Sequence, residues 1–343
     1  MRNKENISDP SFFTSSLEIT GVSKNILIDM LRKMLIIRCA EEKISENVKN
    51  GVIKCPCHLG IGQEAIGTAI ALLTNKNDNS FGAHRSHTHF LALNEDTFSL
   101  FAEVLGRADG CSNGMGGSMH IIDNNFGFRG SVPIVGATIP IATGAGLASK
   151  KKNDNSIAIS YFGDGACEEG VLHESLNLAS ILDLPVLYVC ENNFFSSHLH
   201  IDMRQPSDST SRFAIAHKIK NKIVDGNDVV LIYKILKNII SNIRVSKKPF
   251  FLEAYTYRWK GHVGHRDDID VGVKRKSDLD LWKKRDPIKR LSDSMIKNRL
   301  ISKVFLNEFK IKIQSKINKD WNRALNAPFP KKQSLLDSVY SNK

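Results

Sequence analysis

The stretch from Ile157 to Asn193, which reads IAISYFGDGACEEGVLHESLNLASILDLPVLYVCENN, decides the predicted fold. It opens with a short apolar run, residues 157–162, which predicts a buried strand that ends at Gly163-Asp164-Gly165. Apolar residues follow at helical spacing over residues 168–182, and a second apolar run, residues 186–190, leads to Asn193. Strand, helix and strand in this order predict a right-handed βαβ unit whose two strands are parallel.

The segments on either side of this unit extend the same pattern. Helices are predicted over residues 24–48, 63–73, 136–148 and 229–244 and within the charged region 277–325, and strands over residues 221–224 and 249–255. We therefore predict an α/β fold, in which a doubly wound, mostly parallel sheet is followed by C-terminal helices. Residues 1–22 are expected to form a flexible polar arm, and residues 23–343 a single α/β domain with a C-terminal helical extension.

Composition limits the class of protein. The net charge is +12, but acidic residues interrupt the basic C-terminal third, which favours a solvated surface, or a field that steers anionic substrates, over nucleic-acid binding. No run of about 18 apolar residues predicts a membrane span, and the N-terminus lacks the apolar stretch of a signal peptide. The six Cys lack zinc-site spacing, so free thiols and a cytoplasmic location are expected.

Polar residues stand where the two strands of the βαβ unit end. Because ligands bind at the carboxyl ends of parallel strands, the crossover brings Asp164 and Asn193 to the same edge of the sheet. A carboxylate oxygen and an amide oxygen suit Mg²⁺, which takes its remaining ligands from water and phosphate. Gly163 and Gly165 allow close backbone approach, and the helix beginning near Glu169 directs its N-terminus toward an anion. The pattern predicts a socket for a magnesium diphosphate, and a structural turn with a capping Asn is the alternative.

The glycine-rich segment GRADGCSNGMGGS, residues 106–118, cannot form a regular helix or strand. Two interpretations stay open for it. It is either a loop whose backbone approaches a ligand closely or a flexible surface loop.

Several motifs, taken together, resemble a known family. They are HLGIGQEAIG (58–67), HRSH (84–87), GRADGCSNGMGGSMH (106–120), IVGATIP (134–140), GDGACEEG (163–170), CENN (190–193), YRWKGH (257–262) and DPI (286–288). Their order and spacing resemble the α subunits of the thiamine diphosphate-dependent 2-oxo acid dehydrogenases, including pyruvate, branched-chain and acetoin members. The resemblance runs from about residue 27 to residue 340 and implies the diphosphate-binding half of the thiamine diphosphate-binding fold.

The resemblance assigns cofactor ligands to particular residues. It implies that Asp164, Asn193 and the backbone carbonyl of Phe195 bind Mg²⁺. The residues implied on the cofactor side are Arg85, Gly163, Gly165 and Ala166 at the diphosphate, Val135 at the aminopyrimidine, and His84, where relatives usually have Tyr.

Histidines form a second implied set. His58 and His262 match the family's catalytic histidines, and His262 would also contact the diphosphate. His87 is a further polar candidate, for which a site role and a purely structural role are equally open.

The resemblance also implies partners. The carboxylate that activates the aminopyrimidine comes, in the family, from a β subunit that carries the pyrimidine-binding domain, so Glu64 of this chain is not expected to supply it. The implied assembly is α2β2, which would decarboxylate a pyruvate-like 2-oxo acid and pass the acyl group to the lipoyl group of an acyltransferase.

The loop after His262 departs from the family pattern. It reads VGHRDDIDVGVKRK and lacks the Tyr-Arg pair of many relatives, with Lys274 as the nearest counterpart of that Arg. Two alternatives therefore stay open. One is a thiamine-dependent carboligase or acetoin-type enzyme of a biosynthetic locus, and the other is a catalytically silent binding subunit.

Overall fold

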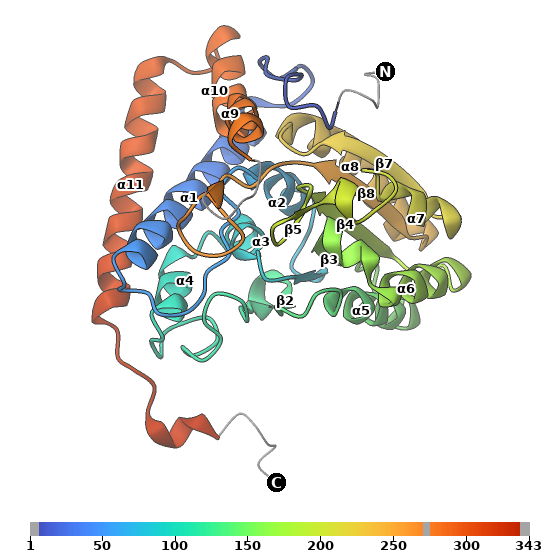
Figure 1. Ribbon diagram of the computed structural model, residues 1–343, viewed down its shortest axis with the longest axis horizontal. Helices are drawn as coiled ribbons and strands as arrows, with labels where there is room; N and C mark the ends of the chain where they lie inside the picture. Colours follow the sequence, from blue (N-terminus) through green and yellow to red (C-terminus); the bar gives the residue numbers. More distant parts are fainter. Residues whose placement is uncertain (1–6, 270–274, 337–343) are drawn as a thin grey trace.

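The computed structural model describes residues 7–269 and 275–336, and a six-stranded sheet runs through its centre (Figure 1). The strand order is β2-β1-β3-β4-β8-β7, and every neighbouring pair is parallel. The strands are β1 Asn79–Gly82, β2 Phe128–Ser131, β3 Ala158–Gly163, β4 Val186–Asn192, β7 Lys220–Asp225 and β8 Phe250–Tyr255. Strands β1 and β2 lie on one side of the switch point and β3, β4, β8 and β7 on the other, which confirms the predicted doubly wound sheet and places its switch point between β1 and β3.

Helices cover both faces of this sheet. They are α1 Lys24–Lys49, α2 Glu64–Ala71, α3 His87–Asn94, α4 Thr97–Val104, α5 Thr138–Lys152, α6 Gly170–Ile181, α7 Ser211–Ala216, α8 Val229–Ser246, α9 Lys276–Lys284, α10 Pro287–Lys297 and α11 Lys303–Asn326. A small antiparallel hairpin, β5 Phe195–Ser196 and β6 Leu199–His200, follows β4. The long helix α11 packs against α1 and α4, on the side of the molecule away from α5 and α6 (Figure 1).

Alternation along the strands creates two apolar cores, one on each face of the sheet. In β3, Ile159 and Tyr161 enter the core that contains α1, α2 and α8, whereas Ala158 and Phe162 enter the core that contains α5 and α6. Successive side chains of a strand point to opposite faces, so a strand that is apolar throughout must be covered on both sides. This explains why β3 and β4 were visible in the sequence as continuous apolar runs.

The described part of the predicted N-terminal arm, residues 7–22, packs against the C-terminal helices. Ile7 and Leu17 are buried, and Arg285 donates a hydrogen bond to the carbonyl of Ile7 (2.9 Å). The N–H of Leu17 donates to Ser294 Oγ in α10 (2.5 Å). Ile7 and Leu17 each join a buried apolar cluster; residues 1–6 lie outside the described part. Among the described residues, no helix has the length and apolar character needed to cross a membrane.

Candidate cofactor site

Strand register places the two predicted metal ligands side by side. Gly163, the last residue of β3, pairs with Glu191 of β4. Asp164 directly follows Gly163 and begins a 3₁₀ turn, while Asn193 follows the end of β4. Both side chains are buried at the carboxyl edge of the sheet, beside the switch point. The sequence therefore anticipated this juxtaposition from the order of strand, helix and strand alone.

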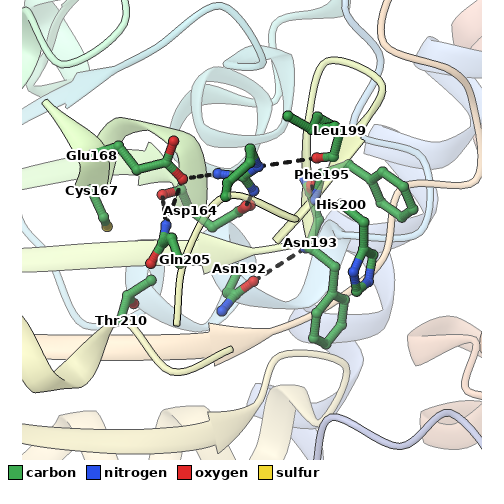
Figure 2. A network of polar contacts seen from close by, with 12 residues as sticks. Asp164, Cys167, Glu168, Asn192, Asn193, Phe195, Leu199, His200, Gln205 and Thr210 are labelled. Carbon is green, nitrogen blue, oxygen red and sulfur yellow. Dashed lines mark hydrogen bonds and ion pairs between the residues drawn. The ribbon is translucent and has the colours of Figure 1, made fainter. Parts of the chain in front are cut away.

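Only one oxygen of the Asp164 carboxylate has a bonding partner. Its Oδ2 forms an ion pair with Arg204, whereas Oδ1 is buried and has no hydrogen-bond partner. Burial raises the pKa of Asp164, and the charge of Arg204 together with nearby backbone N–H groups opposes that rise. Figure 2 shows Asp164, Glu168 and Gln205 converging at this point of the turn. A buried oxygen without a partner is costly, which marks Oδ1 as a position for a ligand or ion.

Asn193 and Phe195 complete a set of oxygen donors. The side-chain oxygen of Asn193 accepts the N–H of Phe195 (3.2 Å) and keeps a second lone pair, while its Nδ2 donates to Gln63 Oε1 (3.4 Å). Phe195 begins β5 just beyond this turn. In the described part of the chain, no three or more His, Cys, Asp or Glu side chains group as a metal site. The donors present fit a hard cation such as Mg²⁺, which accepts one carboxylate, neutral oxygens and phosphate.

A cleft of about 840 Å³, including its open mouth, lies above these residues at the switch point. Its lining is Gln63, Ala83, His84, Arg85, His89, Val135, Gly136, Tyr161, Phe162, Gly163, Gly165, Ala166, Glu191, Asn193, Phe195, Ser196, Ser197 and His262. A Cβ on Gly165 would lie 2.6 Å from Ser196 Oγ, so glycine keeps this turn close to the β5 hairpin. Val135 lies at the mouth, where nearly half of its side chain is exposed.

Three imidazoles meet at one side of the cleft. The rings of His58, His84 and His262 lie edge to face, with centroids 4.7 Å, 4.9 Å and 5.4 Å apart. Burial, and next the charge of Arg85, lowers the pKa of His58 to about 3, of His84 to about 2 and of His262 to about 4. All three rings are therefore neutral near pH 7 and can accept or donate one hydrogen bond each.

Arg85 joins the segments that carry these histidines. Its guanidinium donates to the carbonyl of Leu59 (2.5 Å) and to the carbonyl of His262 (3.2 Å). Burial lowers the pKa of Arg85 to about 10, which leaves it charged at neutral pH. A charged, partly bonded guanidinium on a cleft wall suits an anionic ligand group.

Comparison with known proteins identifies the family of this chain. The model for "Dehydrogenase E1 component" matches residues 32–333. The pyruvate dehydrogenase E1 component subunit alpha of Rickettsia bellii is 32% identical over 317 residues, which cover 92% of this chain and 96% of the relative. The chain belongs to the dehydrogenase E1 component family. Subunit alpha of acetoin:2,6-dichlorophenolindophenol oxidoreductase from Bacillus subtilis is 32% identical over 311 residues, 91% of this chain and 92% of the relative. The pyruvate dehydrogenase subunit alpha of Rhizobium meliloti is 33% identical over 297 residues, 86% of this chain and 82% of the relative.

The family implies thiamine diphosphate as cofactor, and the cleft of this E1 chain offers the polar floor that a diphosphate needs. Gly163, Gly165 and Ala166 form that floor beside Asn193. Asp164, which stands between the two glycines in the sequence, and His58, whose ring contacts those of His84 and His262, are not among the residues that line the cleft. The cofactor-side residues that the sequence proposed are thus gathered around one cleft.

His87 lies outside this group. It is fully buried, and its Nε2 bonds Ser118 Oγ (2.9 Å), while Nδ1 faces Glu41. It is absent from the residues that line the cleft. Of the two roles left open for His87, the structure favours the structural one.

The glycine-rich loop of this E1 chain wraps a carboxylate that belongs to the protein. Glu103, at the end of α4, is fully buried and accepts the N–H groups of Ser112, Gly114, Gly116 and Gly117 at 2.7–3.0 Å. The loop's amides are therefore already used by Glu103. Glu64 is likewise engaged, because Arg38 pairs with it and the N–H of Gly62 donates to it (3.0 Å).

Sequence reasoning missed several residues at or beside the cleft, among them Gln63, His89, Tyr161, Glu191 and Arg204. His89 stacks on Tyr161 (3.9 Å between centroids) and contacts Glu191 Oε1 through Nε2 (3.0 Å). Glu191 and Gln63 stand inside motifs that had been quoted, so their place next to Asn193 and His58 was a usable signal.

The loop after His262 is held by arginine. Lys274, the predicted counterpart of the family's Arg, lies outside the described residues. The next residue, Arg275, is fully buried and donates to the carbonyls of Arg258 and Lys260. Arg258 in turn donates to the carbonyl of Ser197 (2.5 Å), so this loop is bound to the β5 hairpin.

Proposed function

We propose that this chain is the α subunit of a thiamine diphosphate-dependent 2-oxo acid dehydrogenase. It would decarboxylate a pyruvate-like 2-oxo acid and pass the acyl group to a lipoyl acceptor. The observation that carries the proposal is the buried Asp164 carboxylate, whose Oδ1 has no partner, beside Asn193 at the floor of the cleft. Membership of the dehydrogenase E1 component family supports the same assignment.

Bound thiamine diphosphate would supply the electron sink for decarboxylation. Asp164, Asn193 and the carbonyl of Phe195 would hold Mg²⁺, and Arg85 would hold the diphosphate by charge-assisted hydrogen bonds. The neutral rings of His84 and His262, which line the cleft, would hydrogen-bond the 2-oxo acid, and the ring of His58 lies against both of them. His58 Nδ1 is buried and has no partner, so it is available to extend a proton path beside these two rings.

A β subunit would complete the site. Glu64 is bound to Arg38 and is not free to act on the cofactor. A group of exposed apolar side chains next to the cleft mouth and along α5 and α6 suits a protein interface: Ile134, Val135, Ile141, Leu178 and Ile181. We propose an α2β2 assembly that serves a lipoyl acyltransferase, in which residues 23–343 act as one domain. The free thiols suit the cytoplasm.

The proposal is tested on the chain co-purified with a β-type subunit from the same genome. Calorimetry should detect thiamine diphosphate binding that depends on Mg²⁺, and the pair should decarboxylate pyruvate with a dye as electron acceptor. Absence of magnesium-dependent binding by the pair rejects the site assignment, and binding without turnover would favour a silent binding subunit.

A second function is favoured by one specific observation. Relatives named for pyruvate dehydrogenase and for acetoin oxidation are equally similar, at 32% identity each. We therefore also propose an acetoin-type or carboligase activity as the alternative. The two activities are separated by giving the cofactor-bound α and β subunits either a lipoylated domain or a second carbonyl compound. A dehydrogenase should form a stable product with the lipoylated domain, and a carboligase with the carbonyl compound.

A further inference from the structure

Arg204 is placed to control the carboxylate that would bind the metal. It follows the 3₁₀ turn Ile201–Met203, directly after the β5–β6 hairpin, and only 6% of its side chain is exposed. The guanidinium binds three acceptors: Asp164 Oδ2, Glu168 Oε1 and the carbonyl of Leu199, the last at 3.1 Å. Arg204 thus joins the hairpin to both ends of the turn that follows β3.

Gln205 reinforces the same link. Its Nε2 donates to Glu168 Oε1 (2.6 Å) and to the backbone carbonyl of Asp164 (3.4 Å). In Figure 2, Glu168, Asp164 and Gln205 lie close together on one side of this network and Leu199 on the other. Two successive residues of the 201–210 loop therefore hold the turn, which leaves the Asp164 carboxylate little freedom to rotate.

We propose that Arg204 is a positioning residue for the divalent metal. By holding Oδ2, it leaves Oδ1 of Asp164 available to the metal, and it stays bound to Oδ2 when the metal binds Oδ1. The inference rests on the proposed magnesium site and adds the residue that orients its carboxylate. A ligating carboxylate is commonly fixed by a hydrogen bond to its other oxygen, and loss of such a bond typically costs roughly 10- to 100-fold in metal affinity.

The geometry favours positioning over competition. A competing arginine would cover both carboxylate oxygens or bind the other metal ligands, but Oδ1 has no partner and the side chain of Asn193 bonds Phe195 and Gln63. Arg204 is also anchored by Glu168 and Leu199, so it need not leave when a cation arrives. The two roles predict opposite changes in metal affinity when the arginine is removed.

The test uses the co-purified α and β subunits and titrates Mn²⁺, with thiamine diphosphate present, by electron paramagnetic resonance. We expect Arg204→Gln to raise the Mn²⁺ dissociation constant roughly 10- to 100-fold. Arg204→Lys should recover part of the affinity, because it keeps the charge but cannot bridge both carboxylates. The matched control is Arg212→Gln, since Arg212 braces the same loop through Ser209 O (2.7 Å) and Gln205 Oε1 (2.9 Å) without touching Asp164.

An unchanged or lowered dissociation constant in a folded Arg204→Gln pair overturns the proposal, and a lowered one shows that the arginine competes with the metal. If that variant does not fold, Glu168→Gln decides, because it removes the negative charge of one anchor of Arg204 and should weaken Mn²⁺ binding to a smaller extent. Unchanged binding in Glu168→Gln then overturns the proposal. Failure of the unsubstituted pair to bind Mn²⁺ would instead refute the proposed function.

Discussion

Replacing Asp164 by Ala should remove most of the stabilisation of the chain by its cofactor. At a free cofactor concentration of 100 times the dissociation constant, binding stabilises the folded state by about 2.7 kcal/mol. For 343 residues, this corresponds to a rise in Tm of ~4 °C. Loss of a residue that only orients a metal ligand typically weakens metal binding up to ~100-fold, so loss of a direct ligand should weaken cofactor binding by at least ~100-fold. The remaining stabilisation at the same concentration is then about 0.4 kcal/mol.

The measurement is differential scanning fluorimetry of the co-purified pair, with Mg²⁺ and thiamine diphosphate or with neither. The metal-free variant should stay folded, because Glu168 still pairs with Arg204 and the unpartnered Oδ1 is removed. Asp202→Ala is the matched control, since it deletes an exposed carboxylate from the same loop, where Asp202 pairs with the half-buried His200. A full cofactor-dependent shift in Asp164→Ala would refute the reasoning about the metal site.

Three further outcomes are expected. Burial lowers the pKa of His58 to about 3 and of His262 to about 4, so the folded protein resists protonation of these rings. The free energy of unfolding, measured by urea titration, should therefore fall as the pH drops below 6.5. It should fall less in the His58→Gln variant. Asp225→Asn should lower the free energy of unfolding by about 3–5 kcal/mol in urea, because two buried arginines of the C-terminal region lose their shared carboxylate. Gly165→Ala should weaken thiamine diphosphate binding measured by calorimetry, since its Cβ would lie 2.6 Å from Ser196 Oγ, whereas Gly144→Ala, in α5 and outside the cleft lining, meets no atom within 4 Å of its Cβ and should bind normally.

The central elements of the fold were predictable because the local pattern of apolar residues in each of them indicates its burial. Strands β3 and β4 are continuous apolar runs, and α8 repeats apolar residues at helical spacing, so each carries its own signal. Strand β1, with the sequence NSFG, has one large apolar residue and is a strand only because β2 and β3 pair with it on both sides. Its formation depends on tertiary contacts that no short window of sequence contains.

The residues of the site likewise divide into those that a local sequence pattern predicts and those that only the folded structure brings together. Asp164 and Asn193 were predicted because each ends a recognisable strand of one βαβ unit. Arg204 was missed because it comes from an irregular loop that pairs with Asp164 only after the β5–β6 hairpin turns back over the 3₁₀ turn. Glu103 was missed for a related reason: a single acidic residue at the end of a helix gives no hint that it will bind four amides of a later glycine-rich loop.

The charges of the cleft explain why a diphosphate would need a divalent cation here. Among the described residues that line the cleft, Arg85 is the one permanently cationic side chain, and Glu191 is anionic nearby. The three imidazoles are neutral, and Arg204 already neutralises Asp164. The side chains that line the cleft therefore offer a diphosphate little net positive charge, and a cation at Asp164 Oδ1 would supply more. We expect inorganic pyrophosphate to bind the co-purified pair in calorimetry with Mg²⁺ and to lose most of its affinity in EDTA; equal affinity in both would show that the side chains alone balance the anion.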